Sequence, residues 1–165
     1  MDMEARGHSE HPEALRLWLR MLTCTQLVEK QVRTQLREQF DTTLPRFDLM
    51  AQLERNPDGL KMNELSRRMM VTGGNVTGVT DQLVAEGVVE RLEVNGDRRA
   101  YRVRLTPRGR KVFDDMARQH EAWIVSAFES LSQREVEFLH KLLGKVKQHQ
   151  SKQLGTSQTD KVETI

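Results

Sequence analysis

The chain has 165 residues and a formal net charge of +2, and 37% of its residues are hydrophobic while 30% are charged. We expect one soluble, cytoplasmic domain, because no apolar run approaches the roughly 18 residues of a membrane-spanning helix and the polar start MDMEARGHSEHPE excludes a secretory signal. The single cysteine, Cys24, excludes a disulfide framework and a cysteine-cluster metal site, and we expect it to be a small buried apolar residue.

The charge is unevenly distributed along the chain. Residues 61–111 hold 11 Lys or Arg against 6 Asp or Glu, a local charge of +5, whereas the remaining residues hold 15 against 18, a local charge of −3. A basic middle segment is typical of a nucleic-acid-binding module joined to other elements, although solvated surfaces also carry such an excess.

Three helices are predicted in the first 70 residues. Apolar residues recur at three-, four- and seven-residue steps over residues 12–40 without an internal Gly or Pro, which indicates one long helix. Pro45 suits a first helical turn and Asn-Pro-Asp-Gly at 56–59 is a strong stop, so a short helix should span residues 45–55. The spacing in MNELSRRMM predicts a third helix over residues 62–70.

The segment VTGGNVTGVTDQLVAEGVVER predicts a fourth helix, with Thr72 as its cap and Gly87 at its end. Its apolar face holds Val76, Val79 and Leu83. The opposite face carries small and polar residues: Gly74, Asn75, Thr77, Gly78, Asp81 and Gln82. Two short helices, of which the second presents amide and hydroxyl groups outward, indicate a helix-turn-helix whose second helix enters the major groove. Asn and Gln suit the adenine edge, and glycines allow close approach of the backbone.

A β-hairpin follows this helix pair. Residues 89–94 and 99–105 alternate as strands, and Asn95-Gly96-Asp97 between them contains the strongest short hairpin signal. Apolar residues of the second strand alternate with arginines, and Arg98 and Arg99 lie near the tip. A helix-turn-helix with a basic hairpin is a winged helix, whose arginines can reach phosphates or a narrow minor groove. The alternative, a solvated hairpin with arginines for solubility, does not require this position in the chain.

The stretches GDRRAYRVRLTPRG, LPRFDLMAQL, MNELSRRM and VTDQLVAEGVVER, in this order, make the chain resemble the MarR family of winged-helix transcriptional regulators over residues 13–150. The Asp-x-Arg wing followed by Leu-Thr-x-x-Gly is the most specific part of the match. The resemblance implies an obligate homodimer whose two recognition helices and two wings contact a pseudo-palindromic operator, and many members are released from DNA by a small ligand.

The resemblance also assigns site residues. Asn75 and Thr77 fall on the recognition helix, Arg99 is the wing arginine with Arg98 beside it, and Asp97 is the acid that orients wing arginines. The position after Thr77 is often arginine in the family, but it is Gly78 here. Base readout is therefore expected to depend on Asn75, Thr77 and Gln82, while Gly73, Gly74 and Gly78 allow close approach.

Two further helices complete the predicted fold. Thr106-Pro107 starts a helix that extends to residue 128, and Ser132-x-x-Glu135 forms a capping box before the last helix. We expect both, with the first helix, to pack against a second chain. The fold class is mainly α with a small β-hairpin, and the expected organisation is as follows: a disordered N-terminus (1–12), a dimerisation helix (13–43), a winged helix-turn-helix DNA-binding domain (44–106), C-terminal dimerisation helices (107–150) and a flexible tail (151–165).

A small-molecule effector is also predicted. Arg46 lies beside apolar residues of the second helix, where a guanidinium can pair with a carboxylate in bidentate fashion. With His120 and Trp123, the stretch TTLPRFDLMAQL is similar to family members that govern breakdown of aromatic acids. The predicted effector is an aromatic carboxylic acid or its coenzyme A thioester. The alternative is that Arg46 pairs with Asp48, Asp41 or the partner subunit, and that Trp123 belongs to the dimer core.

No enzyme is predicted, because the chain has no Gly-rich phosphate loop or nucleophile elbow, and HEAWI at 120–124 has no second histidine for zinc. No cofactor or metal is expected; His8 and His11 have a ligand-like spacing but lie at a chain end. A different hypothesis is a regulator that needs no ligand or that responds to oxidation of Cys24.

Overall fold

The computed structural model describes residues 11–69 and 75–155, except for the side chains of residues 97–99. The chain divides into two compact units, residues 1–41 and residues 42–165. Within the described residues, no helix has the length and apolar character needed to cross a membrane.

The first unit contains one helix, α1 (Pro12–Phe40), as the periodicity predicts. Pro12 occupies the first turn, where its missing N–H costs nothing. The helix ends at Asp41, which has a positive φ of 49° and donates its N–H to the carbonyl of Arg37 at 3.1 Å. Cys24 is exposed on this helix, so the expectation of a buried cysteine is wrong.

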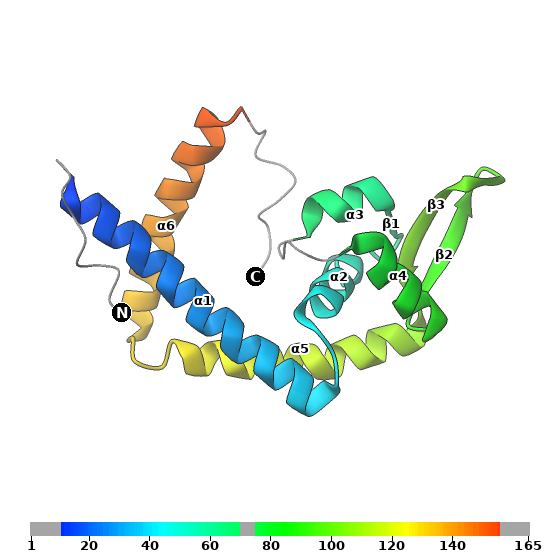
Figure 1. The fold of residues 1–165 in the computed structure, drawn as a ribbon, viewed down its shortest axis with the longest axis horizontal. Coiled ribbons are helices and arrows are strands. Elements are labelled where there is room, and N and C mark those ends of the chain that lie inside the picture. The colour runs from blue at the N-terminus through cyan, green and yellow to red at the C-terminus, as the bar shows by residue number, and fades with distance from the viewer. Residues whose placement is uncertain (1–10, 70–74, 156–165) are drawn as a thin grey trace. The chain divides into compact units, whose positions relative to one another are not determined.

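The second unit holds the remaining elements (Figure 1). In chain order they are α2 (Leu44–Glu54), β1 (Leu60–Lys61), α3 (Met62–Arg68), α4 (Val76–Ala85), β2 (Val89–Val94), β3 (Asp97–Leu105), α5 (Pro107–Ala127) and α6 (Gln133–Gln153). The mainly helical fold with a β-hairpin is confirmed, and the predicted helices are present with boundaries shifted by a few residues.

The three strands form an antiparallel sheet in the order β1-β3-β2. Asn95 and Gly96 both have positive φ values, 56° and 73°, as the two central residues of a type I′ turn require, so the hairpin prediction is confirmed. The short strand β1 was not predicted. It follows Gly59, whose φ is +86° and whose position would place a β-carbon 2.8 Å from the carbonyl oxygen of Val103. A glycine is needed there for β1 to reach β3.

The core of this unit forms where α2 packs against α4, β3 and α5. Val103 and Leu105 are buried on β3, whereas Arg102 and Arg104 remain partly exposed, which confirms the predicted alternation. The buried apolar side chains are Phe47, Leu49, Met50, Leu53, Leu60, Leu65, Leu83, Val88, Val89, Val103, Leu105, Phe113, Met116 and Trp123.

Two expected helix ends are corrected. The structure caps α4 with Asn75, not with Thr72, which lies outside the described residues. The helix α6 begins with the predicted capping box of Ser132 and Glu135 but continues to Gln153, so residues 151–153 are helical and do not belong to a tail. The residues after 155, like residues 1–10, lie outside the described part of the chain.

Candidate nucleic-acid interface

The helix α4 has one buried face and one exposed polar face. Leu83 is buried, and so is Thr80, whose hydroxyl donates to the carbonyl of Val76 at 2.7 Å. Thr77 and Gln82 are exposed. The face that the sequence predicts for DNA is therefore open to solvent, and the buried face orients it.

Asn75 has a structural role that the sequence analysis did not consider. Its Oδ1 accepts the N–H of Gly78 at 3.1 Å, which makes Asn75 the N-cap of α4. Bidentate recognition of adenine uses both Oδ1 and Nδ2 of an asparagine. Because Oδ1 has two lone pairs and the cap uses one of them, one acceptor site on Oδ1 and the donors of Nδ2 remain while α4 keeps this start. Gly73 and Gly74 lie outside the described residues.

Three of the five arginines in residues 96–109 have partners within the chain. Arg102 donates to the carbonyl of Gly59 at 3.1 Å, and Arg104 pairs with Glu90 across the hairpin at 2.7 Å. Arg108 donates to the carbonyl of Glu86 at 2.8 Å. These three contribute to the fold, a role that neither reading of the hairpin included. Arg98 and Arg99 belong to β3, and their side chains, like that of Asp97, lie outside the described part.

The helix α4 and the hairpin are joined by a further ion pair. Asp81 of α4 pairs with Arg91 of β2, and the guanidinium of Arg91 lies 5.3 Å from the centre of the Tyr101 ring on β3. Asp81 belongs to the predicted outward face, but its carboxylate is engaged. No sequence pattern indicates this pairing, because the two residues belong to different elements.

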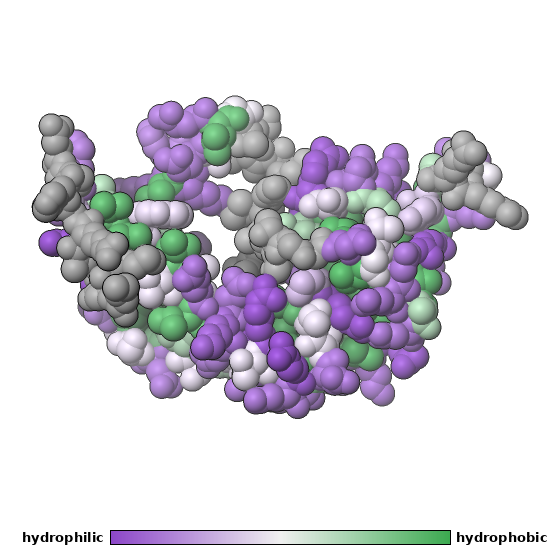
Figure 2. Space-filling view, viewed as in Figure 1, coloured by the Kyte–Doolittle hydropathy of each residue, from purple (hydrophilic) through white to green (hydrophobic). Residues whose placement is uncertain are grey.

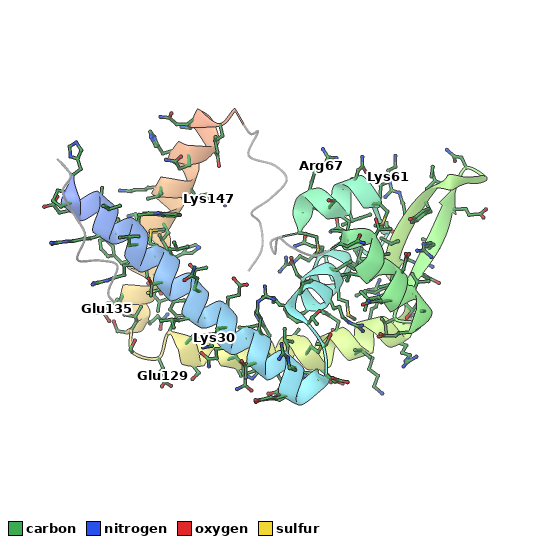
Figure 3. All side chains as sticks on the ribbon, viewed as in Figure 1. Lys30, Lys61, Arg67, Glu129, Glu135 and Lys147 are labelled. Carbon is green, nitrogen blue, oxygen red and sulfur yellow. The ribbon has the colours of Figure 1, made fainter. Side chains whose placement is uncertain are left out.

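Two exposed basic residues near α3 were also missed. Lys61 precedes this helix and Arg67 lies in its last turn, and Figure 3 shows both side chains on the outer side of the helix. The sequence indicated Lys61 and Arg67 only through the net positive charge of residues 61–111. Both can supply positive charge next to α4, because α3 packs against α4.

The predicted effector residues lie on α2 and α5. Arg46 pairs with Glu86, a partner that the sequence analysis did not consider, and its Nε is buried without a hydrogen-bond partner. Next to it, the ring of Phe47 lies 4.7 Å from that of His120 and 5.5 Å from that of Phe113. The ring of Trp123 lies 6.4 Å from His120, edge to face, and Trp123 is buried. Burial lowers the pKa of His120 below its ordinary value.

The histidine pair suggested by the sequence gives no metal site that can be described. His8 lies outside the described residues, and His11 is exposed. Within residues 11–69 and 75–155, no group of three His, Cys, Asp or Glu side chains is arranged to hold a metal ion.

Comparison with known proteins decides the family. A family model described as the MarR family matches residues 40–100, from the last residue of α1 to the first part of β3. A MarR family transcriptional regulator from Silicibacter pomeroyi has a solved structure that is 30% identical to the chain, covering 87% of this chain and 99% of that one with a TM-score of 0.71. The chain belongs to the MarR family.

Two other MarR-type proteins show the same relationship. A structure of a MarR variant from E. coli in complex with operator DNA is 25% identical, covers 84% of this chain and 98% of that one, and has a TM-score of 0.68. YsmB, an HTH-type transcriptional regulator of Bacillus subtilis, is 28% identical over 123 residues, or 74% of this chain and 83% of YsmB. The chain is thus a DNA-binding MarR transcriptional regulator and not an enzyme, as the sequence predicts.

Proposed function

We propose that this MarR regulator is a homodimeric repressor that acts in the cytoplasm on a pseudo-palindromic operator. The observation that carries the proposal is the exposed polar face of α4, followed directly by a hairpin with arginines at its tip. In this proposal α4 enters the major groove, Thr77 and Gln82 face base edges, and Asn75 contributes its Nδ2. Gly73, Gly74 and Gly78 let the backbone approach the duplex.

The wing supplies the contacts to the DNA backbone. Arg99, with Arg98 beside it, reaches phosphates or the minor groove, and Asp97 orients Arg99. Lys61 and Arg67 add positive charge on the neighbouring helix. Since Arg102, Arg104 and Arg108 are engaged within the chain, the wing's contribution depends on its tip.

The exposed apolar stripe of α6 supports the homodimer. In the described chain α6 buries none of its residues, although it carries apolar side chains at three-, four- and seven-residue steps. Apolar residues are visible on its surface in the space-filling view (Figure 2). The stripe residues are Val136, Leu139, Leu142, Leu143 and Val146, each more than a third exposed. A helix of this kind is stable when a second copy covers its apolar side, so we assign residues 13–43 and 107–150 to dimerisation.

Selection from a random duplex library tests the operator proposal. We expect a selected sequence with two inverted half-sites whose centres are about one helical turn apart. Alanine at Asn75, Thr77 and Gln82 should each lower affinity for that sequence by about 1 to 3 kcal/mol and leave binding to a random duplex unchanged. An equal loss on both duplexes would show that α4 does not read the bases.

We further propose that the effector is an aromatic carboxylic acid or its coenzyme A thioester, bound near Arg46, His120 and Trp123. Three observations support this class: the unpaired buried Nε of Arg46, the aromatic rings of Phe47 and His120, and the ion pair of Arg46 with a carboxylate. A ligand carboxylate can take the place of Glu86 on Arg46. Because Glu86 caps the C-terminus of α4, this exchange would release one tie on the recognition helix.

Titration of operator-bound protein with benzoate-type and cinnamate-type acids and their thioesters tests the effector class. A ligand that prefers the non-binding conformer by about 2.7 kcal/mol weakens DNA binding about 100-fold. Arg46→Ala should abolish release, whereas Glu86→Gln, which removes the competing carboxylate, should lower the acid concentration needed. Absence of release by all compounds, or release that Arg46→Ala leaves unchanged, would exclude this class.

A redox-responsive regulator is the second candidate, because the thiol of Cys24 is exposed on α1 and open to oxidants. Release of the operator by peroxide that disappears in Cys24→Ser would establish it. Release by an aromatic acid that is unchanged in Cys24→Ser would favour the first proposal.

A further inference from the structure

The end of α4 and the start of α5 share one capping hydroxyl. Thr106 is the N-cap of α5, and its Oγ1 accepts the N–H of Gly109 at 3.0 Å. The same hydroxyl donates to the carbonyl of Gly87 at 2.8 Å. Gly87 has a φ of +73° and closes α4. A hydroxyl has one donor and two acceptor sites, so a single Oγ1 can satisfy both helix ends.

Two more hydrogen bonds cross the same junction. The N–H of Thr106 donates to the carbonyl of Val88 at 3.1 Å. The guanidinium of Arg108, in the first turn of α5, donates to the carbonyl of Glu86 at 2.8 Å. Carbonyls at a helix C-terminus have no partner within the helix and carry a partial negative charge, so a guanidinium is well placed there. The carbonyls of the three residues that follow α4, Glu86 to Val88, are thus held by Thr106 and Arg108 at the start of α5.

Gly109 permits the close approach of the two helices. It is buried, and a β-carbon at its position would lie 1.9 Å from the carbonyl oxygen of Val88. This contact is to backbone, which cannot rotate away as a side chain can. Any residue other than glycine would therefore push the start of α5 away from the end of α4.

We propose that Thr106, Arg108 and Gly109 are positioning residues for DNA binding: they hold α4 at a fixed angle to α5, so that the orientation of the recognition helix follows α5. The inference rests on the proposed role of α4 in reading the operator. These residues act through α4 and lie outside the polar face assigned to the bases. Loss of the shared cap lets α4 sample other orientations, and affinity for the operator falls with the fraction of molecules that keep the competent one. Binding to random DNA depends on charge and does not require that orientation.

The test compares Thr106→Val, which keeps the shape but removes the hydroxyl, with Thr106→Ser, which keeps the hydroxyl. Binding to the selected operator and to a random duplex is measured well below the melting temperature of each variant, with folding checked by circular dichroism. Thr106→Val should weaken operator binding by up to about fivefold, the largest change in the competent fraction that loss of a cap worth about 1 kcal/mol can cause, with unchanged random-duplex affinity and salt dependence. Thr106→Ser should bind as the native chain does.

Distances between spin labels provide a second readout without DNA. Labels at Ala85→Cys on α4 and Asp114→Cys on α5, in a Cys24→Ser background diluted with unlabelled chain, report the angle between the two helices. We expect a narrow distance distribution for the native junction and Thr106→Ser, and a broad or shifted one for Thr106→Val and Gly109→Ala.

Different results would contradict the positioning role of Thr106 and the role of α4 as the recognition helix. An equal loss of operator and random-duplex binding in Thr106→Val, or unchanged operator binding in that variant, would overturn the positioning role. If alanine at Thr77 and Gln82 also left specificity unchanged, the assignment of α4 as the recognition helix would fail first.

Discussion

At the start of α4, the side-chain amide of Asn75 serves two purposes through its two polar atoms. Oδ1 caps the helix by accepting the N–H of Gly78, and Nδ2 remains available for DNA. A β-carbon at Gly78 would lie only 3.0 Å from Nδ2, so the small residue that departs from the family pattern also leaves room for the cap. Helix capping and the proposed base contact therefore both depend on the side chain of Asn75.

Substitution of Asn75 separates these purposes. Asn75→Ala should lower the free energy of unfolding by about 1 kcal/mol, or about 2 to 4 °C in melting temperature, because the cap is lost. Asn75→Asp keeps an acceptor at the helix start and should melt near the native temperature, but it has no donor for a base and adds a negative charge. Calorimetry and operator binding measure the two effects. Equal melting of both variants with the native chain would contradict the capping role.

His120 makes stability depend on pH. Burial lowers its pKa in the folded state, so between that value and the ordinary value of about 6.5 the unfolded chain binds more protons than the folded one. Neutral, buried His120 makes its full contribution to the free energy of unfolding above about pH 6.5. This contribution is lost as the pH falls from about 6.5 toward the lowered pKa of the folded state. Urea unfolding at several pH values should show a decline that is smaller in His120→Gln than in His140→Gln, which removes an exposed histidine. A decline of equal size in both variants would contradict this assignment.

At the scale of elements, amphipathic periodicity and the turn and capping residues predicted most of the fold. Amphipathic spacing located the helices, Asn95-Gly96 located the hairpin, and Ser132 with Glu135 located the start of α6. These signals are local, so the sequence displays them directly. The strand β1 was missed because two residues carry no periodicity, and Asn75 was taken for a base reader because capping depends on where the helix begins.

The candidate sites were less predictable, because long-range pairs have no pattern in the sequence. Arg46 meets Glu86 forty residues away, and Arg91 meets Asp81 of another element. The aromatic neighbours of Arg46 were only partly foreseen: His120 and Trp123 were proposed, whereas the stacking of Phe47 on Phe113 was not. Residue types at a site can be read from a sequence, whereas their pairing requires the fold.

We expect the arginines of the hairpin to differ in function: Arg99 contacts phosphates, whereas Arg104 pairs within the chain. Arg99→Ala should weaken binding to all duplexes and reduce the slope of log affinity against log salt by about one unit, as loss of one phosphate contact does. The matched control removes Arg104 and its partner Glu90 together, which leaves the net charge unchanged. Filter binding at several salt concentrations should show no change of slope for this control. An unchanged slope in Arg99→Ala would remove Arg99 from the phosphate contacts.

At the scale of the whole molecule, the proposed homodimer rests on the apolar residues exposed on α6. Leu139→Glu with Leu143→Glu should convert the protein to a monomer, since two buried carboxylates without partners oppose association. Lys141→Glu with Lys145→Glu places two glutamates on the opposite side of the helix and should leave the dimer intact. Sedimentation equilibrium distinguishes the two variants. A dimer that persists with glutamates at 139 and 143 would place the interface elsewhere.

The helix α5 is continuous for 21 residues, from the cap it shares with α4 to the exposed Val125 near its other end. At 1.5 Å per residue this is a rod of about 30 Å. A tilt of about 10° around the Ala127 end carries the Pro107 end through about 5 Å, which exceeds the roughly 3.4 Å between successive base pairs. If α4 contacts the bases as proposed, a single unbroken helix would act as a lever arm, because a small change of angle at the Ala127 end would move α4 by more than one base-pair step.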